Sequence, residues 1–347
     1  MYLLHLQLLQ TAKDVLCMQM LTLGDSLELQ GRLQIDEDYT MTPGFRSLGK
    51  QRMKRIRIAG VFIVLIWSMA ALCRTAFAQE DPSGEWSVRF DEDNRERLAG
   101  AEIGDYLGLP INDAGRLRVD SWEAALVELP ENQCRQHGSD YGWRGPSALH
   151  IWKEMDRATQ KVIAYHTHLS AYAAEQTIWM DGRRHPPDYA RHTWEGFSTG
   201  EWEGDQLVVT TTHLKENWLG LNGVPRSDMA TSRVHIMRHG DYLTVAVIMY
   251  DPVYMTEPFI RTTDFVYNPQ QTMAPWPCDP VDEVDRPEGV VPHHLPGTNT
   301  FLDEFARRYG VPFEATRGGA ETMYPEYQLK LKNMPIPPPL PKKKPTQ

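Results

Sequence analysis

The sequence predicts a mainly β protein, in which an antiparallel hairpin meander forms a barrel or a sandwich with flanking helices at both ends. Two observations predict this class. Between residues 134 and 268, short runs rich in β-branched and aromatic residues alternate with turn residues. On both sides of this region, apolar residues recur at helical spacing instead. We therefore expect one β domain between two smaller helical segments.

Residues 79–133 are expected to form an N-terminal loop and helix segment. A strand-like run, WSVRF, opens it. Apolar residues at roughly helical spacing then predict a helix from Pro110 to Leu126, with Pro110 in the first turn. Pro130 is expected to end this helix, because proline cannot continue one.

The β domain, residues 134–268, is expected to contain eight or so strands. The expected strands are residues 149–155, 161–169, 176–180, 200–204, 205–214, 231–238, 241–250 and 259–267. Short turns, such as those at Gly204 and Gly240, join most neighbours and predict hairpins. The usual products of such a meander are a closed, lipocalin-like barrel and a sandwich.

A C-terminal loop and helix segment, residues 269–334, is expected to pack on the β domain. Thr298 or Asn299 can cap a helix through FLDEFARRY, which Gly310 would end. Pro325 can open another. The last residues, 335–347, read PIPPPLPKKKPTQ and predict a disordered, polyproline-like tail.

An export signal is predicted inside the sequence. From Met53, basic residues, an apolar stretch and an AFA end give the three parts of a signal peptide over residues 53–78. Since a signal peptide works at the amino terminus, residues 1–52 are expected to be a spurious extension. These features predict a periplasmic or secreted protein, and the alternative is a membrane-anchored form with an uncleaved signal. No later stretch is apolar for long enough to cross a bilayer, so no stable membrane insertion is expected after cleavage.

The charge balance argues against a nucleic-acid partner. The chain has a net charge of −10, and nine Lys or Arg but six Asp or Glu precede Gln79, so the exported chain carries about −13. Phosphate binding needs clustered cations, and the one basic cluster is Lys342–Lys344 in the tail. Cys134 and Cys278 are expected either to pair in an oxidising compartment or to remain buried thiols. The sequence does not indicate an oligomeric state.

Several catalytic and cofactor motifs are absent from the sequence. It has no GxGxxG after a strand, no GxxxxGK(S/T), no HExxH, no GxSxG and no CxxC. We therefore expect no nucleotide cofactor and no zincin-type metal site.

Polar side chains concentrate in the segment DGRRHPPDYARHTWEGF, residues 181–197. Two prolines stiffen it, and a rigid loop that holds imidazole, guanidinium and carboxylate groups suits acid–base chemistry. The candidate catalytic residues are Asp181, His185, His192 and His213, and the candidate ligand-binding residues are Arg184, Trp194, Glu195, Arg233 and His235. The alternative is structural: Asp-Gly is a good turn, and Arg–Asp pairs often pin a loop to a barrel.

Strand alternation supplies three of these candidates. His213 shares a face with Val209 and Thr211, while Arg233 and His235 share a face of the next strand. Facing inward, His213, Arg233 and His235 would form the polar floor of an apolar cavity. Facing outward, they would be ordinary solvated residues.

Two further histidines alternate on one expected strand. His166 and His168 would point to the same side, which allows metal ligation with another residue. Two alternating histidines are more often surface or hydrogen-bonded residues, and no metal is expected.

The segment IWMDGRRHPPDYARHTWEGFSTGEWEGDQLVVTTTHLKENW resembles a large group of secreted bacterial proteins that share MDGRxHP and GxWEGDxLVV elements. The likeness extends from about Cys134 to the FIRTTDFVY strand and continues into the FLDEF and RGGAETMYPE stretches. It implies export, and it carries over no catalytic residue or cofactor.

Three functions follow from these patterns. The first is binding of a small apolar or aromatic molecule in a barrel cavity. The second is a cofactor-independent lyase, isomerase or hydrolase that uses the His, Asp and Arg side chains of the 181–195 loop. The third is an interaction module of the cell envelope, suggested by the basic, proline-rich tail.

Overall fold

The structure is a computed structural model, and it describes residues 79–89, 102–143, 148–170, 174–273, 281 and 284–341. They belong to one compact unit, Phe77–Gln347. The expected extension at residues 1–52, the signal peptide at 53–78, Cys278 and residues 342–347 lie outside the described residues. The expectations about them therefore stay predictions.

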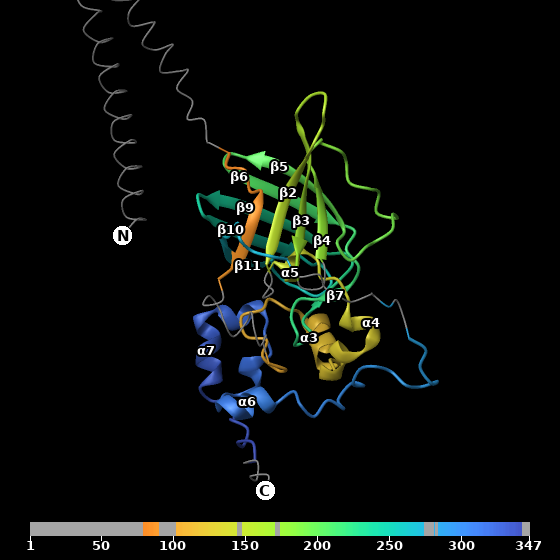
Figure 1. Ribbon diagram of the computed structural model, residues 1–347. Coiled ribbons are helices and arrows are strands. Elements are labelled where there is room, and N and C mark those ends of the chain that lie inside the picture. Colours follow the sequence, from red (N-terminus) through yellow and green to blue (C-terminus); the bar gives the residue numbers. More distant parts are fainter. Residues whose placement is uncertain are drawn as a thin grey trace, which may run out of the picture. The chain divides into compact units, whose positions relative to one another are not determined.

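A closed β-barrel forms the centre of this unit (Figure 1). Its nine strands follow the order β1-β11-β10-β9-β6-β5-β4-β3-β2 around the barrel. The strands are β1 (Gly84–Val88), β2 (Leu149–Met155), β3 (Val162–Leu169), β4 (Ala174–Trp179), β5 (Phe197–Glu203), β6 (Gln206–Thr212), β9 (Thr231–His239), β10 (Tyr242–Tyr250) and β11 (Phe259–Tyr267). A separate pair, β7 (Asn217–Trp218) and β8 (Pro225–Arg226), lies in the β6–β9 connection. The mainly β class is confirmed, with a barrel rather than a sandwich.

Apolar side chains fill much of the barrel interior, because every second residue of each long strand points inward. In β10, Leu243, Val245 and Val247 are buried, while the residues between them are more exposed. These inward side chains join one hydrophobic cluster with bulky rings such as Trp86 and Phe265. Packed hydrophobic residues therefore stand where the inward alternative would have placed a polar floor.

A small polar group lies within this interior. Gln176 Nε2 donates hydrogen bonds to Ser198 Oγ at 2.8 Å and to Thr211 Oγ1 at 3.3 Å. The Ser198 and Thr211 hydroxyls are also 2.8 Å apart. Buried polar groups need such partners, and these three satisfy one another.

One strand pair departs from the expected antiparallel meander. β4 and β5 are parallel, and they pair only at Ile178 with Ser198 and at Trp179 with Thr199. The segment from 180 to 196 is therefore a long connection between parallel neighbours rather than a hairpin turn. This short parallel pairing, the seam of the barrel, is the place where the polar 181–195 loop begins and ends.

Short helices precede the second strand. They are α3 (Asp113–Asp120), the 3-10 helix η3 (Ala124–Glu128), α4 (Pro130–Gln133) and α5 (Ser139–Gly142). The expected single helix over 110–126 is wrong: Asn112 caps α3, and the chain breaks before η3. Pro130 opens α4 instead of ending a helix, as suits a first-turn proline. After α5, Trp143 is buried against Phe265 in the barrel core, with ring centroids 6.3 Å apart.

The C-terminal segment forms α6 (Glu304–Tyr309), two 3-10 turns, η5 (Phe313–Thr316) and η6 (Ala320–Met323), and α7 (Pro325–Leu331). Gly310 ends α6 in the left-handed conformation and Pro325 opens α7, as expected. The expected cap at Thr298 or Asn299 is wrong, because α6 begins after Asp303. Asn299 instead ties the segment to the turn after α3, through hydrogen bonds to Asp120 O and Trp122 O.

A second hydrophobic cluster joins the α3 region and the β7–β8 segment to the end of the barrel. It contains Ile111 and Val119 from the α3 region, Leu219 and Val224 around β7 and β8, and Met255 after β10. Because these residues come from distant parts of the chain, the α3 region, β7 and β8 are held firmly against the barrel end.

Cys134 is disulfide-bonded. Because Cys278 lies outside the described residues, its pairing with Cys134 stays a prediction. In the described part of the tail, Pro338 O accepts a hydrogen bond from Arg307 Nε.

Candidate functional site

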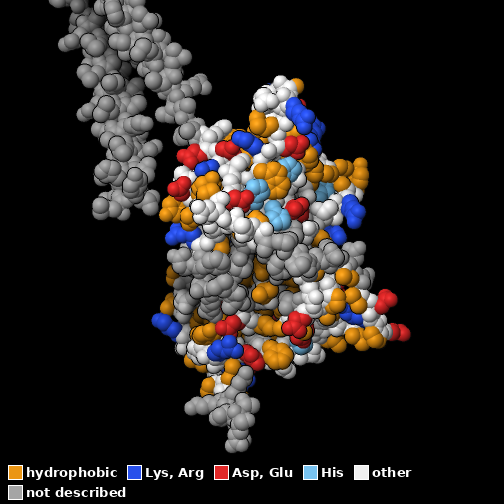
Figure 2. Space-filling view, in the orientation of Figure 1, with side chains coloured by type: hydrophobic (Ala, Val, Ile, Leu, Met, Phe, Trp, Pro, Cys, Tyr) orange, Lys and Arg blue, Asp and Glu red, His pale blue; other side chains and the backbone are white. Residues whose placement is uncertain are grey.

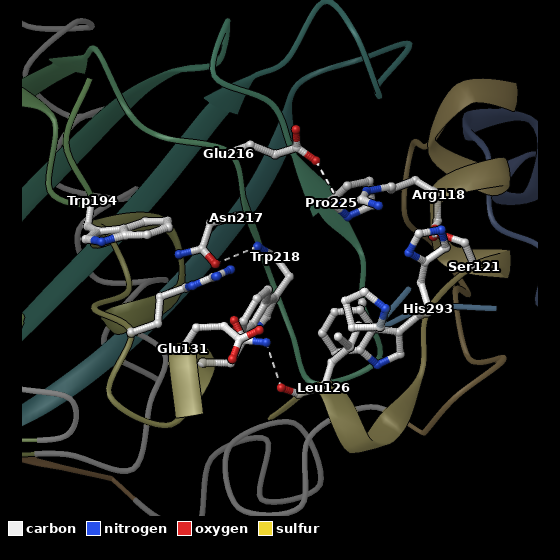
Figure 3. A pocket seen from close by; sticks show the side chains of 15 residues that line it. Arg118, Ser121, Leu126, Glu131, Trp194, Glu216, Asn217, Trp218, Pro225 and His293 are labelled. Carbon is white, nitrogen blue, oxygen red and sulfur yellow. Dashed lines mark hydrogen bonds and ion pairs between the residues drawn. The ribbon is translucent and has the colours of Figure 1, made fainter. Parts of the chain in front are cut away.

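A pocket of about 290 Å³ lies beyond the barrel end, between the short helices and the β7–β8 segment (Figure 3). Figure 3 shows Trp194 and Arg118 at opposite ends of the pocket, with Asn217 and Trp218 between them. The lining residues are Arg118, Ser121, Trp122, Leu126, Glu131, Asn132, Arg135, Trp194, Glu216, Asn217, Trp218, Gly223, Pro225, Pro292 and His293. The pocket is therefore built from four separate regions of the chain.

Three tryptophans, Trp122, Trp194 and Trp218, line the pocket. The Trp122 and Trp218 ring centroids are 5.2 Å apart at an interplanar angle of 58°. Gly223 has a φ of +81°, and a Cβ there would lie 2.3 Å from the Trp122 ring. Only glycine allows this approach of backbone and ring, and the Trp122 indole N–H then donates to Leu221 O at 3.0 Å.

Arg135 is the central cation of the pocket. Its guanidinium carbon lies 4.7 Å from the Trp194 ring centroid and 4.8 Å from that of Trp218. Burial lowers the pKa of Arg135 to about 10, although the nearby Glu216 carboxylate opposes this shift. The guanidinium therefore stays charged at neutral pH while it is stacked on two indole rings.

The two carboxylates that line the pocket are already paired. Glu216 Oε1 lies 3.1 Å from Arg118 Nη2. Glu131 forms an ion pair with Arg286. The positive charges of Arg118 and Arg286 are thus balanced by these partners.

A buried charge cluster lies behind this wall. Arg226 and Asp140 form an ion pair in which the side chains are 0% and 2% exposed, and Arg226 Nη1 donates to Lys215 O at 2.8 Å. One oxygen of Glu195, Oε1, is buried without a hydrogen-bond partner. Burial, with a smaller contribution from the Asp140 charge, raises the pKa of Glu195 well above its ordinary value. Glu195 therefore holds its proton more tightly than an exposed carboxyl group does, and it directly follows the pocket residue Trp194 in the chain.

His137 is the second buried titratable group of this region. Its ring packs against Trp218, with centroids 5.4 Å apart. Burial, and then the charges of Arg135 and Arg226, lower the pKa of His137 to about 3. The imidazole is thus neutral over the physiological range.

The candidate residues at the start of the 181–195 loop lie on the surface. Asp181 Oδ2 accepts from Arg183 Nη2 at 2.6 Å, and this contact lowers the pKa of Asp181 to about 2. Arg183 also stacks on Trp179, 3.4 Å from its centroid. Arg184 is exposed. Neither Asp181 nor Arg184 lines the pocket described above.

Three histidines of the predicted site lie together over the seam. Pro187 O can only accept, so His213 Nε2 donates to it at 3.0 Å, and His213 Nδ1 lies 2.7 Å from Thr212 Oγ1. Thr212 Oγ1 also lies 2.7 Å from His185 Nδ1, and His185 Nε2 lies 2.9 Å from Thr199 Oγ1. The chain of hydrogen bonds uses both nitrogens of both rings, and it ties the loop to β5 and β6.

The third histidine, His192, packs on His213 with ring centroids 5.2 Å apart. Its Nδ1 donates to Leu214 O at 3.0 Å. Burial, and to a smaller degree His213, lower the pKa of His185 below its ordinary value. These hydrogen-bonded rings fit the structural alternative, in which the loop is pinned to the barrel.

Of the two orientations considered for the strand candidates, the structure shows the outward one for Arg233 and His235. Arg233 and His235 lie on the outer face of β9, because Ser232, Val234 and Ile236 point inward. Arg233 pairs with Glu203, and His235 Nδ1 lies 3.0 Å from Gln206 Oε1. His213 follows the end of β6 with a φ of 58°, which takes it out of the strand alternation.

Histidines also gather on one outer face of the barrel (Figure 2). His166 Nε2 lies 3.1 Å from Glu154 Oε2, and His168 Nδ1 lies 3.2 Å from Glu175 Oε1. Among the described residues, no group of three or more His, Cys, Asp or Glu side chains could hold a metal ion. The two histidines thus occupy hydrogen-bonded surface positions.

The sequence interpretation missed Arg135, Asn217 and Trp218. These three residues lie outside the polar 181–197 segment and belong to none of the motifs considered in the sequence. One usable signal was present: Trp194 was predicted to bind a ligand, and it does line the pocket.

The described residues therefore define a β-barrel protein with a tryptophan-lined pocket at one end. In the described part of the chain, no helix is long and apolar enough to span a membrane. No protein-family model, curated protein or solved structure matches the chain.

Proposed function

We propose that the protein binds a small aromatic molecule in the pocket at the barrel end. The single observation that carries this proposal is the pocket wall of Trp122, Trp194 and Trp218. Ligand pockets are mostly apolar and aromatic, with a few placed polar groups, and this one follows that pattern. Its volume of about 290 Å³ is at the small end of such pockets and suits a ligand of one or two rings.

We also propose that the protein works in the periplasm or outside the cell. The signal-peptide pattern from Met53 to Ala78 supports this, as does the disulfide at Cys134. The resemblance to secreted bacterial proteins agrees with the same location.

The binding proposal is tested with a panel of one- and two-ring aromatic compounds, with sugars and short-chain lipids as comparison. We expect aromatics alone to change the tryptophan fluorescence and raise the melting temperature. Leu126→Trp should fill the pocket and abolish the response, whereas the control Leu117→Trp, at a position 60% exposed and outside the pocket, should leave it intact. Equal responses in the two variants would place the ligand elsewhere and contradict the proposal.

One observation favours an enzymatic alternative. Glu195 carries a buried carboxyl oxygen without a partner, and its raised pKa suits a general acid. We propose it, in second place, as the proton donor of a cofactor-independent lyase, isomerase or hydrolase. Mass spectrometry of bound aromatics should then show turnover that Glu195→Gln abolishes while binding persists. Unchanged compounds throughout the panel would leave binding as the function.

A further inference from the structure

We propose that the ligand of this pocket is an aromatic carboxylate, whose carboxylate group binds between the Arg135 guanidinium and the Trp218 indole N–H. This inference rests on the proposed function and names the chemical class of its ligand.

The first argument is the charge of the pocket. Glu216 pairs with Arg118 and Glu131 pairs with Arg286, so both carboxylates that line the pocket already have an arginine partner other than Arg135. No carboxylate among the described residues lies within ion-pair distance of Arg135. Arg135 therefore provides the pocket with a positive charge that its own walls do not neutralise at contact distance, although Glu216 acts on it from further away. A bound anion would complete this balance.

The second argument is hydrogen-bond capacity. Arg135 Nε is buried without a hydrogen-bond partner, and its contacts with Trp194 and Trp218 are ring contacts. A guanidinium that is stacked on rings keeps its N–H groups in its own plane, where they can receive a planar carboxylate. Because the Trp194 and Trp218 rings hold the Arg135 guanidinium in place, its N–H donors are positioned before the ligand arrives.

The third argument is an indole donor without an acceptor. Trp218 is 7% exposed, and its Nε1 is buried with no hydrogen-bond partner. The neighbouring Trp122 provides a comparison, since its Nε1 donates to Leu221 O at 3.0 Å. A buried N–H without an acceptor is unfavourable, and an acceptor on the ligand removes this cost.

The two donors are close enough to serve one group. The Arg135 guanidinium carbon is 4.8 Å from the Trp218 ring centroid, and both residues line the same pocket. Lys215 Nζ, 4.7 Å from the Trp194 ring, adds positive potential on that side. A cationic ligand is therefore disfavoured, and a neutral one would leave Arg135 without a charged partner.

The test compares 2-naphthoate with its neutral and cationic analogues, 2-naphthamide and 2-naphthylmethylamine, by titration of the purified full chain. We expect the carboxylate to bind at least tenfold more tightly than the amide, and the amine to bind most weakly. This comparison needs no variant, so a loss of fold cannot obscure it. If the carboxylate and the amide bind equally in the pocket, the inference fails while the proposed function stands. If none of the three binds, the proposed function fails as well.

Variants then locate the carboxylate. Arg135→Gln should remove the preference for the carboxylate, and Trp218→Phe, which keeps a ring but not the N–H, should reduce it severalfold. Arg183→Gln is the matched control, because Arg183 also stacks on a tryptophan but lies outside the pocket. The thermal midpoint of each variant checks its fold. A carboxylate preference that persists in folded Arg135→Gln would overturn the inference.

Discussion

Asp140→Asn tests whether the buried charge cluster holds the β7–β8 segment at the barrel end. Asparagine keeps the shape of Asp140 and removes its charge. Arg226, at 0% exposure, would then lose its ion-pair partner and keep the hydrogen bond to Lys215 O. Removal of one partner of a buried pair costs about 3–5 kcal/mol of unfolding free energy, because the other charge remains buried.

The ionisation of Glu195 determines where in this range the cost of Asp140→Asn should fall. The Asp140 charge helps to raise the pKa of Glu195, so Asp140→Asn favours ionisation of Glu195 close to Arg226. The new carboxylate would partly replace the lost one, and we expect a cost of about 3 kcal/mol, at the low end of that range. With Glu195→Gln added, this replacement is impossible. The double variant should exceed the sum of the single variants by about 1 kcal/mol, as expected for coupled neighbours.

The measurement is urea unfolding followed by tryptophan fluorescence at pH 7, with the m-value compared between variants. Asp113→Asn is the control, because Asp113 also pairs with an arginine but its side chain is 98% exposed. The control should leave the midpoint unchanged. An Asp140→Asn protein as stable as wild type, or strictly additive variants, would refute this account of the cluster.

Three further predictions follow from particular residues. Gly223→Ala should lower the unfolding free energy by about 3 kcal/mol, because the new Cβ would collide with the Trp122 ring and the backbone is left-handed there. The control Gly204→Ala has the same left-handed backbone but open space around it, and it should cost only about 1 kcal/mol in the same unfolding assay. The folded-state pKa of Glu195 is raised, so its contribution to stability is complete below its unfolded-state pKa and is lost as the pH rises through the folded-state pKa. In a pH series of melting temperatures, Glu195→Gln should flatten this decline. An unchanged slope would contradict the prediction. Thr212→Val should interrupt the hydrogen-bond chain over the seam and speed protease cleavage within residues 181–192, and equal cleavage rates would show that the chain does not hold the loop.

The barrel strands could be predicted because alternation and turns agree along the sequence. DYLTVAVIMY carries apolar residues at every second position and FIRTTDFVY is rich in β-branched and aromatic residues, and the two segments form β10 and β11 within one residue of the expected bounds. The parallel pairing of β4 and β5 could not be predicted in this way. Alternation describes the two faces of one strand and contains no information about which strand lies beside it.

The inward face of β9 shows where the interpretation of one pattern went wrong. TSRVHIMR has two possible faces, one with Ser232, Val234 and Ile236 and the other with Arg233 and His235. Burial of the aliphatic face is favourable, and burial of the second would desolvate a guanidinium and an imidazole. The hypothesis of an internal polar floor required the costlier face, and the structure adopts the other one.

The helix expected over 110–126 ends early, next to a contact with a distant part of the chain. Apolar spacing continued through the segment, but the chain leaves the helix at Ser121, and Trp122 then packs against Gly223 more than one hundred positions away. A contact between residues so distant in sequence cannot be inferred from the spacing of either one. The same limit applies to the pocket, whose walls meet only after the barrel has formed.

The position of the pocket follows from the size and filling of the barrel. A closed sheet of about eight strands has an interior just wide enough for side chains. Here the nine-stranded interior receives Trp86, Trp143, Tyr165 and Phe265, four large rings that occupy much of this space. Space for a ligand then has to arise in the connections between the strands. The β6–β9 connection lies beside α3 and α4 and contributes to the tryptophan-lined wall of the pocket. The barrel thus acts as a rigid frame, and any change of ligand specificity should map to the connections at this end rather than to the strands.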